Sequence, residues 1–348
     1  MRPESTKIDQ TDSKNADGAS SDIGSAETDA FTPNSKRNGV LEDLSMSGAD
    51  LADKSDSLEL IEKPFFLGLP MWSNRSWTGS LFPKSANNKL NLKYYSQVFD
   101  SVEGNTTFYA LPGRELVCDW IEQLTPGFQF CFKIPRAVTH ENNLRYCGVE
   151  LSEFFTRLEP LSDYSGTFMI QLPENFGPGQ LGDLDRFIQE LPSNYHFAVE
   201  VRHTDFFNRE EEEKALNRLL RDNEIDRVCF DSRALFSRPA LTAQEKDAHK
   251  KKPKLPVHAI ATSTKPILRF IGCSDVEQNK QFFLPWVEKI REWRDQGIQP
   301  SIFIHTPDNV AAPEQAVILH GMLNNIPGWV PLEKPLLNSA DEAQLSFF

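Results

Sequence analysis

Ionisable residues repeatedly follow short apolar segments in this sequence. The clearest case is the run Val199-Glu200-Val201-Arg202-His203, which continues the apolar segment 195–199. That segment predicts a buried parallel strand. Charged side chains are rarely buried unless they are paired, so those that follow the strand either pair with each other or face a polar cavity. The recurrence of this pattern indicates that several strand ends share one site.

Polar residues recur at the predicted C-terminal ends of seven strands, and they fall into two sets. The candidate catalytic residues, which could move protons, are Glu103, His140, Glu200, His203 and Asp231. The candidates for holding an anionic substrate are Asn105, Lys133, Arg136, Gln171, Arg202, Arg269, His305 and Asp308. Guanidinium groups bind phosphate or carboxylate through paired hydrogen bonds. The two sets together predict metal-independent acid–base chemistry on a small phosphorylated or carboxylated molecule.

Other interpretations of the same residues stay open. The charges could form an ion-pair network that closes a barrel, or the pocket could bind a ligand without transforming it. Histidines and carboxylates at strand ends are also typical of divalent-metal isomerases and phosphodiesterases. However, the sequence contains no H-x-H or H-E-x-x-H motif. The nearby cations also oppose the assembly of several carboxylates around a metal ion, so no metal site is expected.

A lysine-rich run, Lys250-Lys251-Lys252-Pro253-Lys254, is the one feature that favours nucleic acid as a partner. It could contact a phosphate backbone, although a solvated loop is its more common meaning. The formal net charge of −13 opposes general nucleic-acid binding, because such binding depends on Lys and Arg neutralising phosphates. Nucleic-acid binding, if it occurs, is therefore expected to be weak and salt-sensitive.

A glycine motif between two predicted elements does not indicate a nucleotide cofactor. Residues 177–182 match G-x-G-x-x-G. Four residues separate the preceding strand from Gly177, and Pro178 has no N–H to donate inside a phosphate-binding turn. We therefore expect an ordinary connection here, and no cofactor.

The elements that must position these residues alternate between strand and helix. Strands are predicted at 65–70, 101–105, 128–134, 167–172, 195–199, 227–231, 266–271 and 301–305. Helices are predicted at 92–99, 115–124, 151–161, 181–191, 210–223, 284–296 and 314–325. Eight strands in this alternation are typical of an α/β protein with a (β/α)₈ TIM-type barrel, with an open doubly wound sheet as the alternative. A long basic loop, 232–263, is expected in place of the sixth helix.

Composition separates the barrel from its two ends. Residues 1–60 hold 13 acidic and 6 basic side chains and one aromatic residue, which predicts a disordered acidic tail. Residues 61–330 form the expected barrel, and 331–348 a C-terminal strap or tail. The five scattered cysteines indicate reduced thiols and a cytoplasmic protein, and no segment has the apolar length of a membrane span.

Several segments together resemble the YecE family, a bacterial family of unknown function. The most characteristic of them are 99–109, 132–136 with Thr139-His140, 171–173, 199–203, 231–233, 256–259, 269–272 and 305–309. The resemblance spans about residues 64–328 and omits the N-terminal tail. It implies a TIM-type barrel and supports the positions of the strand ends. It implies no particular reaction.

Overall fold

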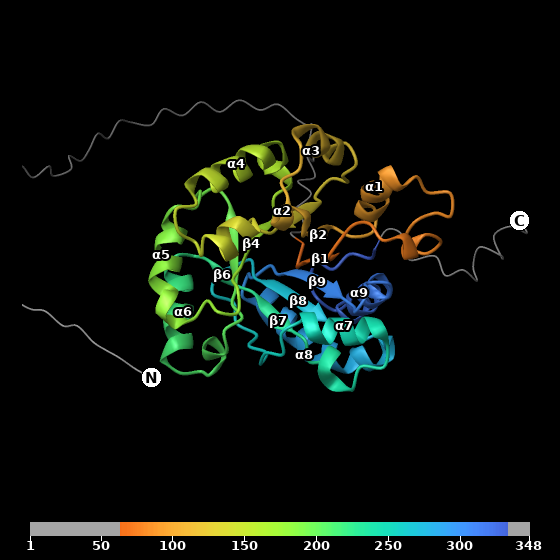
Figure 1. Ribbon diagram of the computed structural model, residues 1–348. Coiled ribbons are helices and arrows are strands. Elements are labelled where there is room, and N and C mark those ends of the chain that lie inside the picture. The colour runs from red at the N-terminus through yellow and green to blue at the C-terminus, as the bar shows by residue number, and fades with distance from the viewer. Residues whose placement is uncertain (1–62, 333–348) are drawn as a thin grey trace, which may run out of the picture. The chain divides into compact units, whose positions relative to one another are not determined.

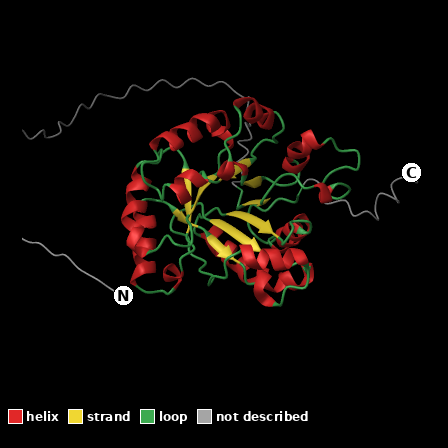
Figure 2. Cartoon of the chain, viewed as in Figure 1, coloured by secondary structure: helices red, strands yellow, loops and turns green. Residues whose placement is uncertain are grey.

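A computed structural model describes residues 63–332 of the chain. The expected tail at residues 1–60 lies outside the described residues, as does the expected C-terminal segment from residue 333 onward. In the part that is described, parallel strands alternate with helices along the chain (Figures 1 and 2).

All eight predicted strands are present, and one of them is interrupted. The strands are β1 (Phe66–Leu69), β2 (Ser101–Gly104), β3 (Gln129–Phe132), β4 (Thr167–Gln171), β5 (His196–Glu200), β6 (Asp226–Arg227), β7 (Cys229–Asp231), β8 (Ile267–Ile271) and β9 (Ser301–His305). Strands β6 and β7 are the two parts of the single strand expected at 227–231, and only Val228 separates them.

The helices follow the strands at close to the predicted positions. They are α1 (Asn91–Ser96), α2 (Thr106–Tyr109), α3 (Arg114–Ile121), α4 (Gly148–Leu158), α5 (Leu181–Gln189), α6 (Glu211–Asp222), α7 (Ala243–Lys251), α8 (Val276–Asp295) and α9 (Ala312–Met322). None of the helices in residues 63–332 is both long and apolar enough to cross a membrane.

The expectation that a basic loop replaces the sixth helix was wrong. The segment after β7 contains α7, which the sequence marks with a capping box. The Thr242 hydroxyl accepts a hydrogen bond from the Glu245 N–H, and the Glu245 carboxylate accepts one from the Thr242 N–H. Lys250 and Lys251 belong to the last turn of this helix, where their charges suit its negative end.

The strands form two parallel sheets in the hydrogen-bond pattern. Six strands pair in the order β3-β2-β1-β9-β8-β7, and three in the order β4-β5-β6. Isolated bridges from Phe130 to Ser165 and from Lys133 to Met169 link β3 to the start and middle of β4. The fold is thus α/β with parallel strands, and the single closed sheet of a TIM barrel is not found as one continuous ladder.

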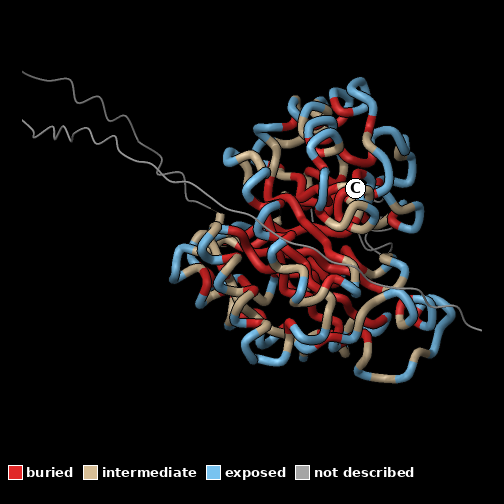
Figure 3. Tube along the Cα trace, turned by 60° about the vertical axis from the view of Figure 1, so that its left-hand side comes forward, coloured by how far each residue is buried: buried red, intermediate tan, exposed pale blue. Residues whose placement is uncertain are grey.

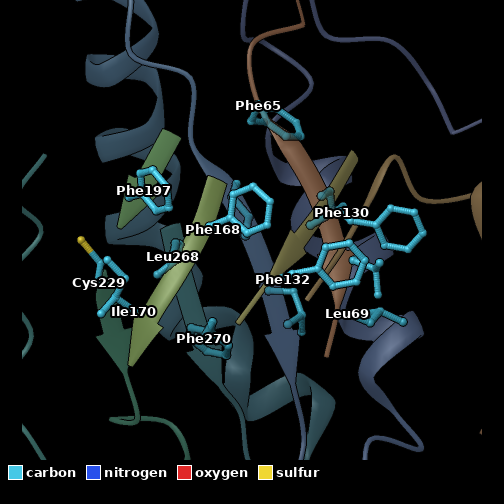
Figure 4. Packing of buried hydrophobic residues seen from close by; sticks show 14 of the residues in the cluster. Phe65, Leu69, Phe130, Phe132, Phe168, Ile170, Phe197, Cys229, Leu268 and Phe270 are labelled. Carbon is cyan, nitrogen blue, oxygen red and sulfur yellow. The ribbon is translucent and has the colours of Figure 1, made fainter. Parts of the chain in front are cut away.

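Side chains that alternate along each strand form an outer apolar layer. Phe130 and Phe132 stack with ring centroids 4.8 Å apart, and Phe132 also stacks on Trp120 of α3. Phe270 packs on Phe283 of α8 with tilted rings, whose centroids are 4.5 Å apart. Figure 4 shows several of these side chains on neighbouring strands, and Figure 3 shows the buried strands within exposed helices. Each fully buried phenylalanine contributes roughly 2 kcal/mol of stability, so this layer binds the helices to the strands.

The residues between them point the other way and form a smaller inner cluster. Its members come from both sheets and from the interruption between β6 and β7: Cys131, Met169, Ala198, Val228, Ile267 and Phe303. Because strand side chains alternate with a period of two, the next inward positions are Lys133, Gln171, Glu200, Phe230, Arg269 and His305. An apolar layer therefore lies directly beneath a mostly polar one.

Replacing Gly68 of β1 with alanine should destabilise the protein by about 3 kcal/mol or more. An added Cβ would lie 2.6 Å from the carbonyl carbon of Ser101 on β2, so the two paired strands would have to separate. Gly148→Ala is the matched control, because nothing lies within 4 Å of its added methyl group and alanine favours helix α4. Urea unfolding of both variants measures the difference. Equal stabilities of the two variants would contradict this account of β1.

Candidate functional site

The buried guanidinium of Arg269 on β8 lies between two carboxylates from other strands. Its Nε and Nη2 donate to the two oxygens of Glu103 on β2, each at 2.8 Å. Its Nη1 donates to Glu200 Oε2 on β5 at 2.5 Å. All three side chains are at most 3% exposed. One guanidinium thus joins strands of both sheets.

Further polar groups complete the network around these carboxylates. His305 Nε2 lies 3.0 Å from Glu103 Oε2, and Lys133 Nζ lies 3.3 Å from Glu103 Oε1. Lys133 Nζ also donates to Gln171 Oε1 at 3.0 Å. Arg202 Nε donates to Glu200 Oε1 at 2.9 Å, and Arg202 Nη2 lies 2.8 Å from the same oxygen. The network therefore collects the inward-facing polar residues of β2, β3, β4, β5, β8 and β9.

Both carboxylates of the network are ionised. Burial opposes the ionisation of Glu103, but Arg269 and Lys133 outweigh it and hold the Glu103 pKa well below its usual value. Burial is likewise outweighed at Glu200, where Arg269, Arg202 and Lys133 lower the pKa to about 2. The two carboxylates in turn overcome the effect of burial on Arg269 and raise its pKa. Neither glutamate can therefore donate a proton near neutral pH in this state.

The histidines near the network are neutral. Burial lowers the pKa of His305 to about 3, against the opposing effect of Glu103. A neutral ring that faces an ionised carboxylate must carry its proton on the facing nitrogen, so His305 donates to Glu103. Burial and the charges of Arg136, Arg202 and Lys133 lower the His140 pKa to about 4.

A cavity of about 770 Å³ opens above this network. Its floor includes Glu103, Lys133, Gln171, Arg269 and His305, and Arg202 and Asn105 also line it. One wall is apolar and contains Met71, Trp72, Phe108 and Tyr109. The cavity therefore combines a charged floor with an aromatic wall.

Two lysines of the basic run line the same cavity, which sequence reasoning missed. Lys251 and Lys252 reach it from the end of α7. Burial and the charge of Arg269 lower the Lys252 pKa to about 8. Within residues 63–332 the half-buried Lys252 ammonium has no hydrogen-bonding partner. The position of the lysine-rich run between two predicted strands could have indicated that it reaches the site, but its composition suggested a solvated loop.

Six of the predicted site residues are not among those that line the cavity: Glu200 is joined to the floor through Arg269, and the other five lie elsewhere. Asp231 is buried, but it accepts from Trp286 Nε1 at 2.7 Å and from Arg233, because it is one residue out of phase with the inward positions of its strand. Arg136 pairs with Glu141 at 3.4 Å and is half-exposed. The others are His140, whose Nδ1 lies 2.9 Å from Thr139 Oγ1, His203, whose Nδ1 accepts from the Asp205 N–H, and Asp308, whose Oδ1 accepts from the Val310 N–H.

Asn105 lies in the cavity wall and donates to the Pro70 carbonyl at 2.9 Å, so it ties the loop after β1 to β2.

Among residues 63–332, no three His, Cys, Asp or Glu side chains converge in a group that could hold a metal ion. The two carboxylates of the network, Glu103 and Glu200, are engaged by Arg269.

Replacing Glu200 with glutamine should cost about 3 kcal/mol of stability at neutral pH, because it leaves Arg269 and Arg202 short of a buried negative charge. The folded-state pKa of Glu200 lies below the unfolded value of 4.5, so the stabilisation is complete above pH 4.5. It is lost as the pH falls towards about 2. The difference between variant and wild type should shrink over that interval.

Urea unfolding at several pH values measures this difference. Glu292→Gln is the control, because Glu292 pairs with Lys289 on the exposed face of α8 and its loss should change little. A Glu200→Gln penalty that is as small as the control's, or that does not depend on pH, would contradict the network described above.

Comparisons with known proteins identify the family of this chain. The family described as "Protein of unknown function DUF72" matches residues 66–337. The chain is 43% identical over 249 residues to the UPF0759 protein YecE of Escherichia coli K12, which covers 72% of this chain and 89% of that protein. The corresponding YecE protein of Escherichia coli O157:H7 is 42% identical over the same length.

Two solved structures share the fold. A DUF72 family protein from Thermotoga maritima has a TM-score of 0.58 at 23% identity and covers 75% of this chain and 99% of its own. One from Enterococcus faecalis has a TM-score of 0.57 at 17% identity and covers 75% and 97%. These likenesses support the fold alone. The sequence matches confirm the resemblance to the YecE family, and the chain belongs to the DUF72 family of proteins of unknown function, which includes the UPF0759 protein YecE.

Proposed function

We propose that this protein binds a small organic anion, phosphorylated or carboxylated, in the cavity above Arg269, and transforms it by metal-independent acid–base chemistry. The observation that carries the proposal is the charge of the cavity. Five cationic side chains line it, Lys133, Arg202, Lys251, Lys252 and Arg269, and within residues 63–332 the network beneath them contains two carboxylates, Glu103 and Glu200. Lys251 also has a partner in Asp247 at 2.8 Å, which still leaves an excess of two positive charges.

The excess charge lies where a ligand can use it. Positive charges gathered in a low-dielectric pocket repel each other, and an anionic ligand relieves that repulsion. Glu103 and Glu200 both accept hydrogen bonds from Arg269, and neither contacts the Lys252 ammonium. The Lys252 ammonium, which has no hydrogen-bonding partner within residues 63–332, can therefore bind a carboxylate or phosphate of the ligand.

The apolar wall supports an organic ligand over a free inorganic ion. Trp72 is held edge-on by Trp120 and Phe130, and Phe108 packs against Tyr109 and His140. Such fixed aromatic faces suit the carbon skeleton of a ligand whose acidic group lies on the charged floor. A cavity of about 770 Å³ accommodates a molecule of that kind.

The acid–base groups we propose are lysines rather than the histidines expected from the sequence. The His305 and His140 pKa values of about 3 and 4 keep both rings neutral. Burial, together with Arg269, lowers the pKa of Lys133 to about 8, and that of Lys252 is also about 8. A group whose pKa lies near the working pH transfers protons most effectively. Lys133 and Lys252 meet that condition in this cavity.

We also propose that the two sheets together form a TIM-type barrel. The bridges between β3 and β4 on one side, and the single residue between β6 and β7 on the other, support a ring of eight parallel strands. The inner cluster, which draws residues from both sheets, supports the same arrangement. The cavity would then occupy the C-terminal face of the barrel, where barrel enzymes build their active sites. The free cysteines of the described residues favour the cytoplasm as the location.

Small organic anions should raise the melting temperature of the wild-type protein. A ligand at a hundredfold excess over its Kd stabilises the native state by about 2.7 kcal/mol. A panel of sugar phosphates and short-chain carboxylates, with neutral sugars for comparison, tests this by thermal unfolding. Lys252→Met and Arg202→Ala should abolish the rise, because each removes a cation of the cavity.

Lys250→Met is the matched control, since Lys250 is exposed in the same basic run and does not line the cavity. It should leave the rise intact. If no anion stabilises the wild type, or if Lys250→Met loses the rise as fully as Lys252→Met, the proposal fails. The second result would favour the nucleic-acid alternative, which would use the exposed lysines of the run.

A further inference from the structure

We propose that Lys133 Nζ forms a covalent imine with a small aldehyde or ketone that carries an acidic group. This inference rests on the proposed function and deepens it by naming the substrate class and the nucleophile. It is carried by the position of one amine on the floor of the cavity, between a neutral acceptor and a carboxylate.

Lys133 is held in place at both ends. Its backbone lies just after β3, where its carbonyl accepts from Thr107 Oγ1 at 2.8 Å. Its Nζ is fixed by Gln171 Oε1 at 3.0 Å and Glu103 Oε1 at 3.3 Å, and it lies 5.8 Å from the ring centroid of Phe108. A nucleophile with one fixed position saves the entropy of orienting it against a bound carbonyl.

The surroundings of this amine favour its neutral, nucleophilic form. Lysines become nucleophilic when they are desolvated or lie beside another cation, and Lys133 satisfies both conditions. It is 6% exposed, and the Arg269 guanidinium shares its carboxylate partner, Glu103. With a pKa of about 8, roughly one molecule in ten carries the free amine at pH 7.

Lys252 has a different role in this arrangement. Lys252 is half-buried and has no hydrogen-bonding partner within the described part of the chain, so its ammonium can follow the acidic group of the substrate. Its pKa of about 8 also allows it to donate a proton. Glu103 cannot donate one, because its pKa lies well below its usual value.

The step is balanced without an oxidant or reductant. The Lys133 ammonium first loses a proton, and the free amine then adds to the carbonyl carbon while the carbonyl oxygen takes up a proton. A proton leaves the nitrogen, a second proton reaches the oxygen, and the C–O bond breaks as water departs. One ammonium ion and one carbonyl group thus give one protonated imine and one water molecule.

Borohydride trapping tests the proposal, because it reduces an imine to a stable secondary amine. The full-length protein is incubated with pyruvate, or with dihydroxyacetone phosphate as the phosphorylated probe, and then reduced. The expected product carries the mass of the probe less one oxygen atom on the peptide that contains Lys133. Acetone, which lacks an acidic group, should give at least tenfold less product at the same concentration.

Lys133→Arg keeps the positive charge and should lose the product, whereas Lys250→Met, whose residue is exposed and does not line the cavity, should keep it. The modified peptide of the wild type identifies the residue directly, so the test does not depend on the folding of the variant. Modification of Lys252, or equal modification of Lys133 and the exposed Lys246, would overturn the assignment.

The result also separates the two proposals from each other. If anions stabilise the wild type but neither probe modifies Lys133, imine formation is refuted and anion binding stands. If no anion stabilises the protein and no modification occurs, both proposals fail.

Discussion

The site depends on one buried ionic contact, that of Arg269 with Glu103 and Glu200. The guanidinium reaches from β8 to β2 and β5, so it joins three strands that are far apart in the sequence. Each group would be costly to bury alone, and each becomes tolerable because the others are present. Both carboxylates bind the arginine. The ammonium groups of Lys133 and Lys252 are therefore not fully neutralised, and burial lowers their pKa values. The charge of the cavity is therefore a direct consequence of how Arg269 is held.

The alternation of side chains along the strands decides which residues reach that contact. Starting from the inner apolar cluster, a step of two residues leads from Ile267 to Arg269, from Ala198 to Glu200 and from Phe303 to His305. A step of one residue leads instead to the outer layer, where Phe270 packs on α8. Asp231 follows the same rule, since its neighbour Phe230 faces Arg269 at 5.5 Å while Asp231 itself binds Trp286. A single periodicity thus separates the charges that build the site from those that attach helices.

The sequence predicted the strands well because each is a short apolar segment bounded by polar residues. It also predicted the convergence of Glu103, Lys133, Glu200, Arg202 and Arg269, since parallel strands bring their C-terminal ends together. It did not predict that Lys252 lines the cavity, because that depends on the path of the chain after α7, and composition says nothing of the path. Arg136 and Asp308 were expected there for a similar reason: both follow strands, but they lie on loops whose local hydrogen bonds direct them elsewhere. Helix α7 was not predicted because its residues are mostly charged and show no apolar periodicity, although Thr242 and Glu245 form a capping box.

The two lysines are the part of the network that stability alone does not explain. The pKa of each lysine falls to about 8 on folding, because burial disfavours the charged ammonium. At neutral pH the native state is therefore less stable than it would be with unperturbed amines. An ion-pair network selected only to hold strands together would gain from a third carboxylate beside these amines. A bound anion whose acidic group lies beside Lys252 supplies that missing charge, and it would raise the Lys252 pKa towards its ordinary range. Binding should therefore take up protons near pH 8, so that the protonation of the site and the occupancy of the site become one linked equilibrium.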